Sequence, residues 1–212
     1  MAELPIELDD GLNDHLKRIL DVEGKIPRAL DALGPLAGRD ALLLDGAEGV
    51  RAQQLRDVGA RVSFAGARQS DGSVGFGAAD ASADVVVSLW SSFRGAAPEE
   101  LAEARRVLRP GGRLLVVHDY GRDDVSHLRG VLPEYGPWSK RGGPFLSDGF
   151  KVRVVHCFWT FESIEAAGAF LAAAFADAGR ALASALKRPR LSYNVAIYHR
   201  TFGAPASTER VG

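Results

Sequence analysis

Apolar residues recur along the chain with two different spacings, one typical of buried strands and one typical of amphipathic helices. Four short runs are rich in apolar residues, as expected for parallel strands that helices cover on both faces. These runs are residues 41–44, 61–65, 84–89 and 114–117. Residues 50–58 and 98–108 instead carry apolar side chains along one side of a helix. This alternation predicts an α/β domain with a mainly parallel sheet.

The two ends of the chain carry further patterned segments. Residues 9–20 and 24–33 predict two amphipathic helices, which form either a structural cap on the sheet or a lid over a substrate. Towards the C-terminus, the β-rich residues 151–161 and 191–202 flank one long alanine-rich helix over 162–186. We therefore expect three parts along the chain, namely an N-terminal helical cap (1–36), an α/β domain (37–203) and a flexible tail (204–212).

The segment between the second and third of these strands has a different composition. Residues 66–83 are rich in Gly, Ala, Ser and Asp. They are too few, and too poor in large apolar side chains, to form a helix followed by a buried strand. The strand expected at this place in an alternating α/β chain is therefore predicted to be missing or vestigial.

A glycine turn joins the first strand to the first helix of the α/β domain. Gly46 and Gly49 follow the strand, and Asp45 stands beside them. A turn between the carboxyl end of a strand and the amino end of a helix is where open α/β sheets hold nucleotide-like ligands. We expect Gly49 to be the least replaceable residue of this turn, because a Cβ there would crowd the helix start and any ligand.

Composition and charge narrow the class of protein. The 212 residues are 46% hydrophobic and carry a formal net charge of −1, so nucleic acid is not a favoured partner. The single cysteine, Cys157, excludes an internal disulfide, and five scattered histidines show no metal-ligand spacing. No run of about 18 apolar residues is present, and residues 1–10 carry acids where a signal peptide carries bases. These features favour a cytoplasmic protein with no membrane segment and no metal site.

Residues 83–117 carry a recognisable combination of motifs. ADVVVSL, a helical pattern and then RRVLRPGGRLLVV resemble the second half of class I S-adenosylmethionine-dependent methyltransferases. The order of elements fits that family over residues 41–202. The resemblance implies a Rossmann-like three-layer sandwich with an antiparallel last strand, and S-adenosylmethionine as the cofactor. It places the RPGG turn at the sheet end opposite the cofactor.

The glycine-rich cofactor motif of that family is degenerate in this chain. The family has an acid inside the first strand, where Leu43 stands here. Of the three glycines in its G-x-G-x-G motif only Gly49 is kept, because Asp45 and Ala47 occupy the other two positions. An acid at the end of the second strand is also missing, and Asp45 is expected to compensate by holding an amino group or a ribose hydroxyl. The resemblance implies that the cofactor-binding residues are Asp45, Gly46, Ala47, Gly49, Ala65, Gly66, Leu89 and Trp90.

Candidates for chemistry follow the third and fourth strands. Trp90 either walls the cofactor pocket or packs in the core, and His118 is either a general base or a structural histidine. No residue is assigned as catalytic, and the oligomeric state is left open. The resemblance implies a methyltransferase acting on an unidentified small-molecule acceptor. The alternative is a catalytically inactive protein of the same fold that serves as a binding or partner subunit.

Overall fold

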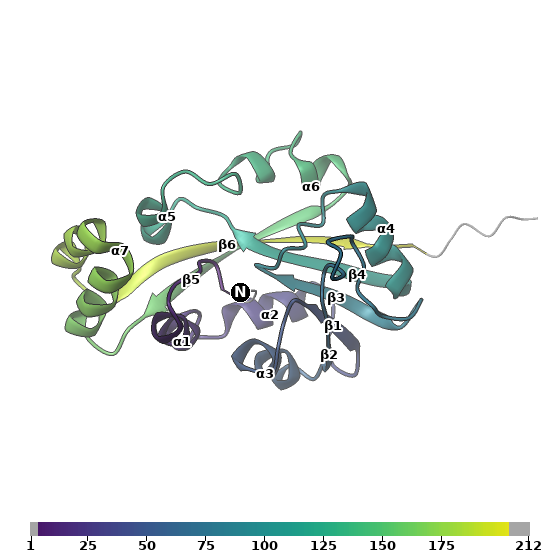
Figure 1. Cartoon of the computed structure of the whole chain (residues 1–212), viewed down its shortest axis with the longest axis horizontal. Helices are drawn as coiled ribbons and strands as arrows, with labels where there is room; N and C mark the ends of the chain where they lie inside the picture. Colours follow the sequence, from purple (N-terminus) through teal and green to yellow (C-terminus); the bar gives the residue numbers. More distant parts are fainter. Residues whose placement is uncertain (1–3, 204–212) are drawn as a thin grey trace, which may run out of the picture.

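The computed structural model describes residues 4–203, so the tail expected at 204–212 lies outside the described residues (Figure 1). The strands are β1 (Asp40–Leu44), β2 (Arg61–Ala65), β3 (Ala83–Leu89), β4 (Leu108–Asp119), β5 (Lys151–Thr160) and β6 (Arg190–Thr201). The helices are α1 (Asp10–Ile19), α2 (Lys25–Ala32), α3 (Val50–Asp57), α4 (Pro98–Val107), α5 (Asp124–Arg129), the 3-10 turn η1 (Pro137–Ser139), α6 (Pro144–Ser147) and α7 (Ile164–Ala185).

The six strands form one mixed sheet in the order β2-β1-β3-β4-β6-β5. β1 is parallel to β2 and β3, and β3 is parallel to β4, whereas β6 is antiparallel to both of its neighbours. The prediction of a mainly parallel sheet with an antiparallel last strand is therefore confirmed. Residues 66–83 contribute no strand before β3 begins, and an isolated bridge between Arg68 and Val74 is all the pairing that this described segment makes.

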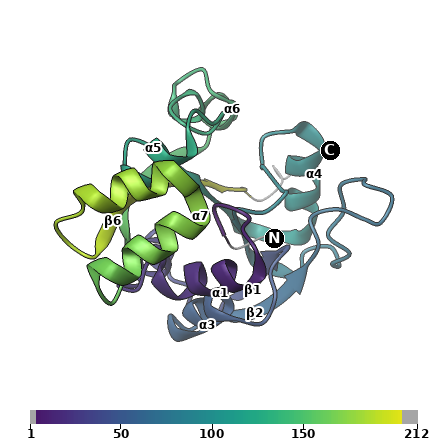
Figure 2. The same ribbon diagram turned by 60° about the vertical axis from the view of Figure 1, so that its left-hand side comes forward.

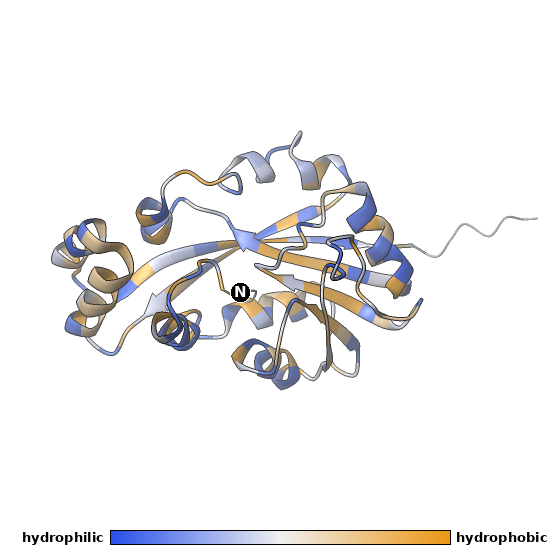
Figure 3. Ribbon diagram, in the orientation of Figure 1, coloured by the Kyte–Doolittle hydropathy of each residue, from blue (hydrophilic) through white to orange (hydrophobic). Residues whose placement is uncertain are grey.

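Helices cover both faces of the sheet (Figure 1). α1, α2, α3 and α7 pack on one face, and α4 and α6 pack on the other. Because successive residues of a strand point to opposite faces, Val85 and Val87 belong to the first core and Val86 belongs to the second. Figure 3 accordingly shows the middle of the central strands mainly in the orange of apolar residues, between two helical layers. This double burial explains why the strand runs in the sequence do not alternate with polar residues.

The two N-terminal helices share the core of the sheet. Asp9 caps α1 by accepting a hydrogen bond from the Leu12 N–H at 3.0 Å. Leu16 is fully buried, and Leu20 forms an isolated antiparallel bridge with Trp159 of β5. The helices thus lie in the position of a structural cap.

The prediction of one continuous helix over 162–186 is wrong. Ala176 has a φ of 46° and interrupts α7, whose two halves fold back on each other (Figure 2). A Cβ on Gly179 would lie 1.9 Å from the Leu171 carbonyl oxygen, so a glycine is needed where the halves meet. By length and composition, α7 resembles a membrane span. Each half, however, rises at most about 18 Å, which is less than the roughly 30 Å of a bilayer core.

Candidate functional site

Two residues with left-handed backbone mark the carboxyl ends of the neighbouring strands β1 and β3. Asp45 follows β1 with a φ of 52°, and Trp90 follows β3 with a φ of 47°. This conformation is costly for residues with a Cβ, and Asp is among those that tolerate it best. Non-glycine residues held in this way gather at functional sites. β1 and β3 also flank the point where the strand order reverses, at which open α/β sheets bind ligands.

The Asp45 carboxylate connects three strand ends. Its Oδ1 accepts a hydrogen bond from the Ala67 N–H at 2.7 Å, just beyond β2. Its Oδ2 accepts two from Ser92 beyond β3, from the N–H at 3.0 Å and from the hydroxyl at 2.6 Å. A carboxylate has room for about four hydrogen bonds. Asp45 therefore keeps one acceptor position for a ligand, and its main observed role is structural.

The turn after Asp45 is open to solvent. Gly46 is half-buried, and Ala47 and Gly49 are exposed before α3 begins. Gly49 has an extended backbone, with φ 164°, and an added Cβ would meet no atom within 4 Å. The expectation that a Cβ on Gly49 would crowd the helix start is therefore wrong. The helix begins freely here, and only contact with a ligand would constrain that residue.

The other predicted cofactor residues lie on either side of Asp45. The Ala65 carbonyl accepts a hydrogen bond from the Asp45 N–H at 2.7 Å, and Gly66 is exposed next to it. Leu89 is buried in the core below the strand ends. Trp90 is half-buried above that core. The structure thus brings all the predicted residues to one edge of the sheet, although Leu89 presents a packed side chain there.

Asp119 is the centre of a buried polar group at the end of β4. Its carboxylate is 4% exposed and accepts hydrogen bonds from the Trp90 indole N–H at 3.0 Å, from the Tyr193 hydroxyl and from the Arg129 guanidinium. The Trp90 ring also stacks on Tyr193, with ring centroids 6.3 Å apart. The Trp90 ring is therefore packed on Tyr193, and the same residue lines a cavity at the strand ends; its place in a cofactor pocket stays a prediction.

His118 is a buried and neutral histidine. It is 2% exposed, and its Nε2 has no hydrogen-bond partner among the described residues. Its ring stands edge-on to Trp138, with centroids 5.1 Å apart. Burial, together with the nearby Arg94 guanidinium, lowers the pKa of His118 to about 3. At neutral pH the ring therefore carries no charge and can accept a hydrogen bond.

A small cavity of about 100 Å³ opens between these groups. It is lined by Leu4, Pro5, Trp90, Arg94, His118, Asp119, Arg129 and Glu134. Leu4 is 3% exposed, and the N-terminal end of the described chain lies beside the strand tips in Figure 1. The chain's own N-terminal segment therefore closes this side of the site.

Three residues of the site carry no signal in the sequence. Arg129 and Tyr193 reach Asp119 from α5 and β6, which only the folded topology brings together. Leu4 belongs to a segment without helical or strand periodicity, so its burial does not show in the pattern. Within residues 4–203, no three His, Cys, Asp or Glu side chains are grouped in a way that could hold a metal ion.

No protein-family model and no curated protein matches the chain. Solved structures do match it, among them a candidate type II methyltransferase from Anaeromyxobacter dehalogenans. That match has a TM-score of 0.56 at 18% identity and covers 84% of this chain and 97% of the other. The chain has the class I methyltransferase fold. A S-adenosylmethionine-dependent methyltransferase from Aquifex aeolicus is also similar, with a TM-score of 0.47, 16% identity and coverage of 91% of this chain and 98% of the other.

The point between β1 and β3 where the strand order reverses, at which open α/β sheets bind ligands, lies at the turn that Asp45 begins. In the conformation described, the cavity of about 100 Å³ at this edge is smaller than the roughly 300 Å³ of a typical ligand pocket. A ligand of the usual size therefore fits this cavity only if the segment with Leu4 and Pro5, which lines it, moves.

Proposed function

We propose that the protein is a methyltransferase that binds S-adenosylmethionine at the turn containing Asp45, Gly46, Ala47 and Gly49. The acceptor in this proposal is a small, polar, uncharged molecule. The single observation that carries the proposal is the polar cavity at the strand ends, which His118 lines and beside which its Nε2 is buried without a partner among the described residues. An unpaired buried ring nitrogen costs stability, so its retention is best explained by a ligand that forms a hydrogen bond with it; in this proposal the nitrogen accepts.

The charges around the cavity favour a neutral acceptor. Arg94 pairs with Glu134 at 2.8 Å, and Arg129 pairs with Asp119. Each guanidinium is already matched by a carboxylate, so a charged acceptor would find no free counter-charge. A hydroxyl or an N–H of an uncharged group can donate a hydrogen bond to His118 Nε2.

S-adenosylmethionine supplies an electrophilic methyl group when it is bound. The part of this chain is to orient the acceptor and to exclude water. With a pKa of about 3, His118 is too weak a base to remove a proton fully at pH 7. Its role in this proposal is to hold the proton of the acceptor hydroxyl or amine at Nε2, so that the lone pair points away from the ring.

The N-terminal segment serves as the lid of the site in this proposal. Asn13 holds Leu8 in place, because its amide Oδ1 accepts from the Leu8 N–H at 3.0 Å and its Nδ2 donates to the Leu8 carbonyl at 2.8 Å. No backbone hydrogen bond joins residues 4–6 to the sheet among the described residues. Movement therefore begins at Leu8, and the side chain that must leave the core is that of Leu4.

A second function, a partner subunit without catalytic activity, is favoured by two observations. The strand-end acids of the family are replaced by Leu43 and by Ala65 and Gly66, and the Asp45 carboxylate is mostly occupied within the chain. In a partner subunit without activity, Leu4 would be a fixed part of the core and would not move.

Calorimetry with S-adenosylhomocysteine separates the two functions. Leu4→Ala removes burial that contributes about 1.5–3 kcal/mol, so it should tighten binding by roughly ten- to hundred-fold relative to the parent protein. Val131→Ala, on a side chain that is 98% exposed, is the matched control and should leave the affinity unchanged. If neither the parent nor Leu4→Ala binds at about 1 mM, the inactive subunit is the correct function. Equal, tight binding by the parent protein and Leu4→Ala would support the methyltransferase function and would show that the N-terminal segment is not a lid.

A further inference from the structure

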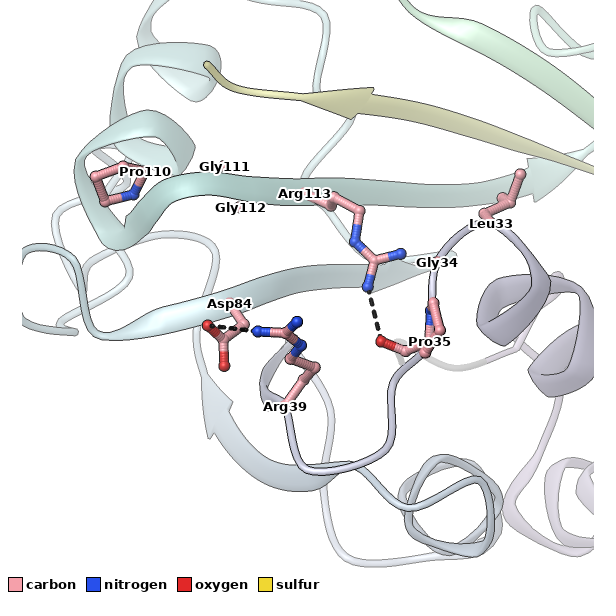
Figure 4. Close-up of a pocket in the computed structure, with 9 residues that line it drawn as sticks. All are labelled: Leu33, Gly34, Pro35, Arg39, Asp84, Pro110, Gly111, Gly112 and Arg113. Carbon is pink, nitrogen blue, oxygen red and sulfur yellow. Dashed lines mark hydrogen bonds and ion pairs between the residues drawn. The ribbon is translucent and has the colours of Figure 1, made fainter. Parts of the chain in front are cut away.

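A second cavity, of about 230 Å³, lies at the opposite edge of the sheet, where the parallel strands begin (Figure 4). Its walls come from the loop after α2, from the start of β3 and from the RPGG turn of β4. They are formed by Leu33, Gly34, Pro35, Arg39, Asp84, Pro110, Gly111, Gly112 and Arg113. The proposed methyltransferase site uses none of these residues.

Two guanidinium groups and one carboxylate, that of Asp84, line this cavity. Arg113 donates from Nη2 to the Pro35 carbonyl at 3.2 Å, whereas its Nη1 is buried without a partner among the described residues. Arg39 reaches Asp84 only at 3.9 Å. That carboxylate already accepts the Asp40 N–H at 2.9 Å and pairs with Arg109 at 3.1 Å. An unpaired donor on a cation is costly to bury, so this arrangement favours an anion nearby.

Gly34 makes room for the Arg113 side chain. A Cβ on Gly34 would lie 1.7 Å from Arg113 Nη1, so any other residue here would push the guanidinium away. In Figure 4 the Arg113 and Arg39 side chains extend from different elements toward the same space. The position of the two cations is therefore built into the loop after α2 and is not a result of chance exposure.

The positive charge continues from Arg113 across the same face of the sheet. His199 of β6 pairs with Lys151 of β5, and Arg153 lies two residues further along that strand. Burial, and then the charges of Lys151, Arg113 and Arg153, lower the pKa of His199. Lys151 and Arg153 are exposed, and within residues 4–203 neither forms an ion pair with a carboxylate.

We propose that Arg39 and Arg113 bind one phosphate group of a small anion in this cavity, and that Lys151 contacts a second phosphate group of the same anion. Two strand spacings, about 10 Å, separate β4 from β5, and Lys151 lies two residues further along the sheet than Arg113. A chain of two or three phosphates and the long lysine side chain can together span this separation. Arginine forks bind phosphate oxygens in pairs, and lysine adds a point charge. The cavity of about 230 Å³ suits a phosphate group better than a large organic body, for which pockets of roughly 300 Å³ or more are typical.

Calorimetry with sodium tripolyphosphate at low ionic strength tests this site. Arg39→Gln removes a mostly exposed side chain and should weaken binding about tenfold or more, since a charge-assisted hydrogen bond is lost. Lys151→Gln should weaken it by a smaller factor, because this side chain lies further from the cavity, and should leave the core intact. Arg180→Gln, another exposed arginine on α7, is the matched control. Arg113→Gln should abolish binding if it folds.

Three results would overturn the proposal. The first is no heat from the parent protein at about 1 mM tripolyphosphate, and the second is equal affinity in Arg39→Gln and the control. The third is tight binding of a single-stranded oligonucleotide that tripolyphosphate does not displace, which would indicate a nucleic-acid surface. Affinity for S-adenosylhomocysteine should be the same in parent and Arg39→Gln, so the outcome does not depend on the proposed methyltransferase activity.

Discussion

Replacing Asp45 tests whether its carboxylate holds the strand ends together. Asp45→Ala removes the acceptor of three hydrogen bonds, one from Ala67 and two from Ser92. Hydrogen bonds to a charged group contribute about 1.5–3 kcal/mol each when buried, and less at a half-exposed site such as this one. We expect the free energy of unfolding to fall by about 2–4 kcal/mol in total.

Two further variants separate the hydrogen bonds from the backbone strain. Asp45→Gly loses the same bonds but relaxes the φ of 52°, so it should be about 1 kcal/mol more stable than Asp45→Ala. Asp45→Asn tolerates the left-handed backbone and keeps one oxygen, so it should retain roughly half of the stabilisation. The expected order of stability is parent, Asn, Gly and then Ala.

Urea unfolding followed by far-UV circular dichroism measures this order, because each variant should shift the midpoint and leave the slope unchanged. Ser70→Ala, on an exposed residue of the 66–83 segment, is a control that should have no effect beyond about 0.5 kcal/mol. If Asp45→Ala were as stable as this control, the observed hydrogen bonds would not hold the strand ends, and the reasoning would be refuted.

Three other perturbations have expected outcomes. The pKa of His118 is about 3 in the folded protein and near 6.5 in the unfolded chain, so the unfolded chain binds more protons between these two pH values. The free energy of unfolding should therefore fall as pH drops below about 6.5, by at most about 1.4 kcal/mol per pH unit. His118→Phe should remove this pH dependence, which urea midpoints at pH 7 and pH 5 would measure. Gly179→Ala should lower the thermal midpoint strongly, because the added Cβ would clash with the Leu171 carbonyl oxygen. Gly168→Ala, whose Cβ would make only an ordinary contact, should raise the thermal midpoint by the equivalent of about 0.5–1 kcal/mol. A similar response of both variants would contradict the packing of α7. Hydrogen bonds from two arginines lower the pKa of Asp40 to about 2, so its stabilisation should be lost as pH falls from about 4 to about 2, and acid titration of Asp40→Asn should lack this step.

The pattern of apolar residues predicts the sheet well because its strands are covered on both faces. Val85, Val86 and Val87 are all fully buried, and such a run has few alternatives to a parallel strand. The same reasoning fails for α7, whose alanine-rich stripe is compatible with one helix or with two. The break at Ala176 is decided by the close packing of Gly179 on Leu171, which is a tertiary contact and leaves no mark on the helical period.

The location of the candidate site could be predicted more completely than its contents. A glycine turn after β1 indicates the correct edge of the sheet, because the carboxyl ends of parallel strands meet there. The partners of Asp45, however, lie 22 and 47 residues away along the chain, at Ala67 and Ser92. No local pattern reports such distances. The presence of Asp45 where the family has a glycine is explained by the structure, in which this residue has a φ of 52°, a conformation that Asp tolerates.

Asp45 and Leu4 lead to opposite expectations for ligand binding, and this makes the function of the turn measurable. If the last acceptor position of Asp45 holds the cofactor's amino group or ribose hydroxyl, Asp45→Asn should weaken S-adenosylhomocysteine binding roughly tenfold. If Asp45 only connects the strand ends, the same variant should lose stability and keep its affinity once folded. Leu4→Ala acts at the entrance and should tighten binding in either case. Comparing the double variant Leu4→Ala/Asp45→Asn with Leu4→Ala alone therefore measures the effect of Asp45 on affinity at concentrations where binding is easily detected. A double variant that binds as tightly as Leu4→Ala would exclude Asp45 as a ligand contact and leave backbone groups of the turn as the remaining candidates.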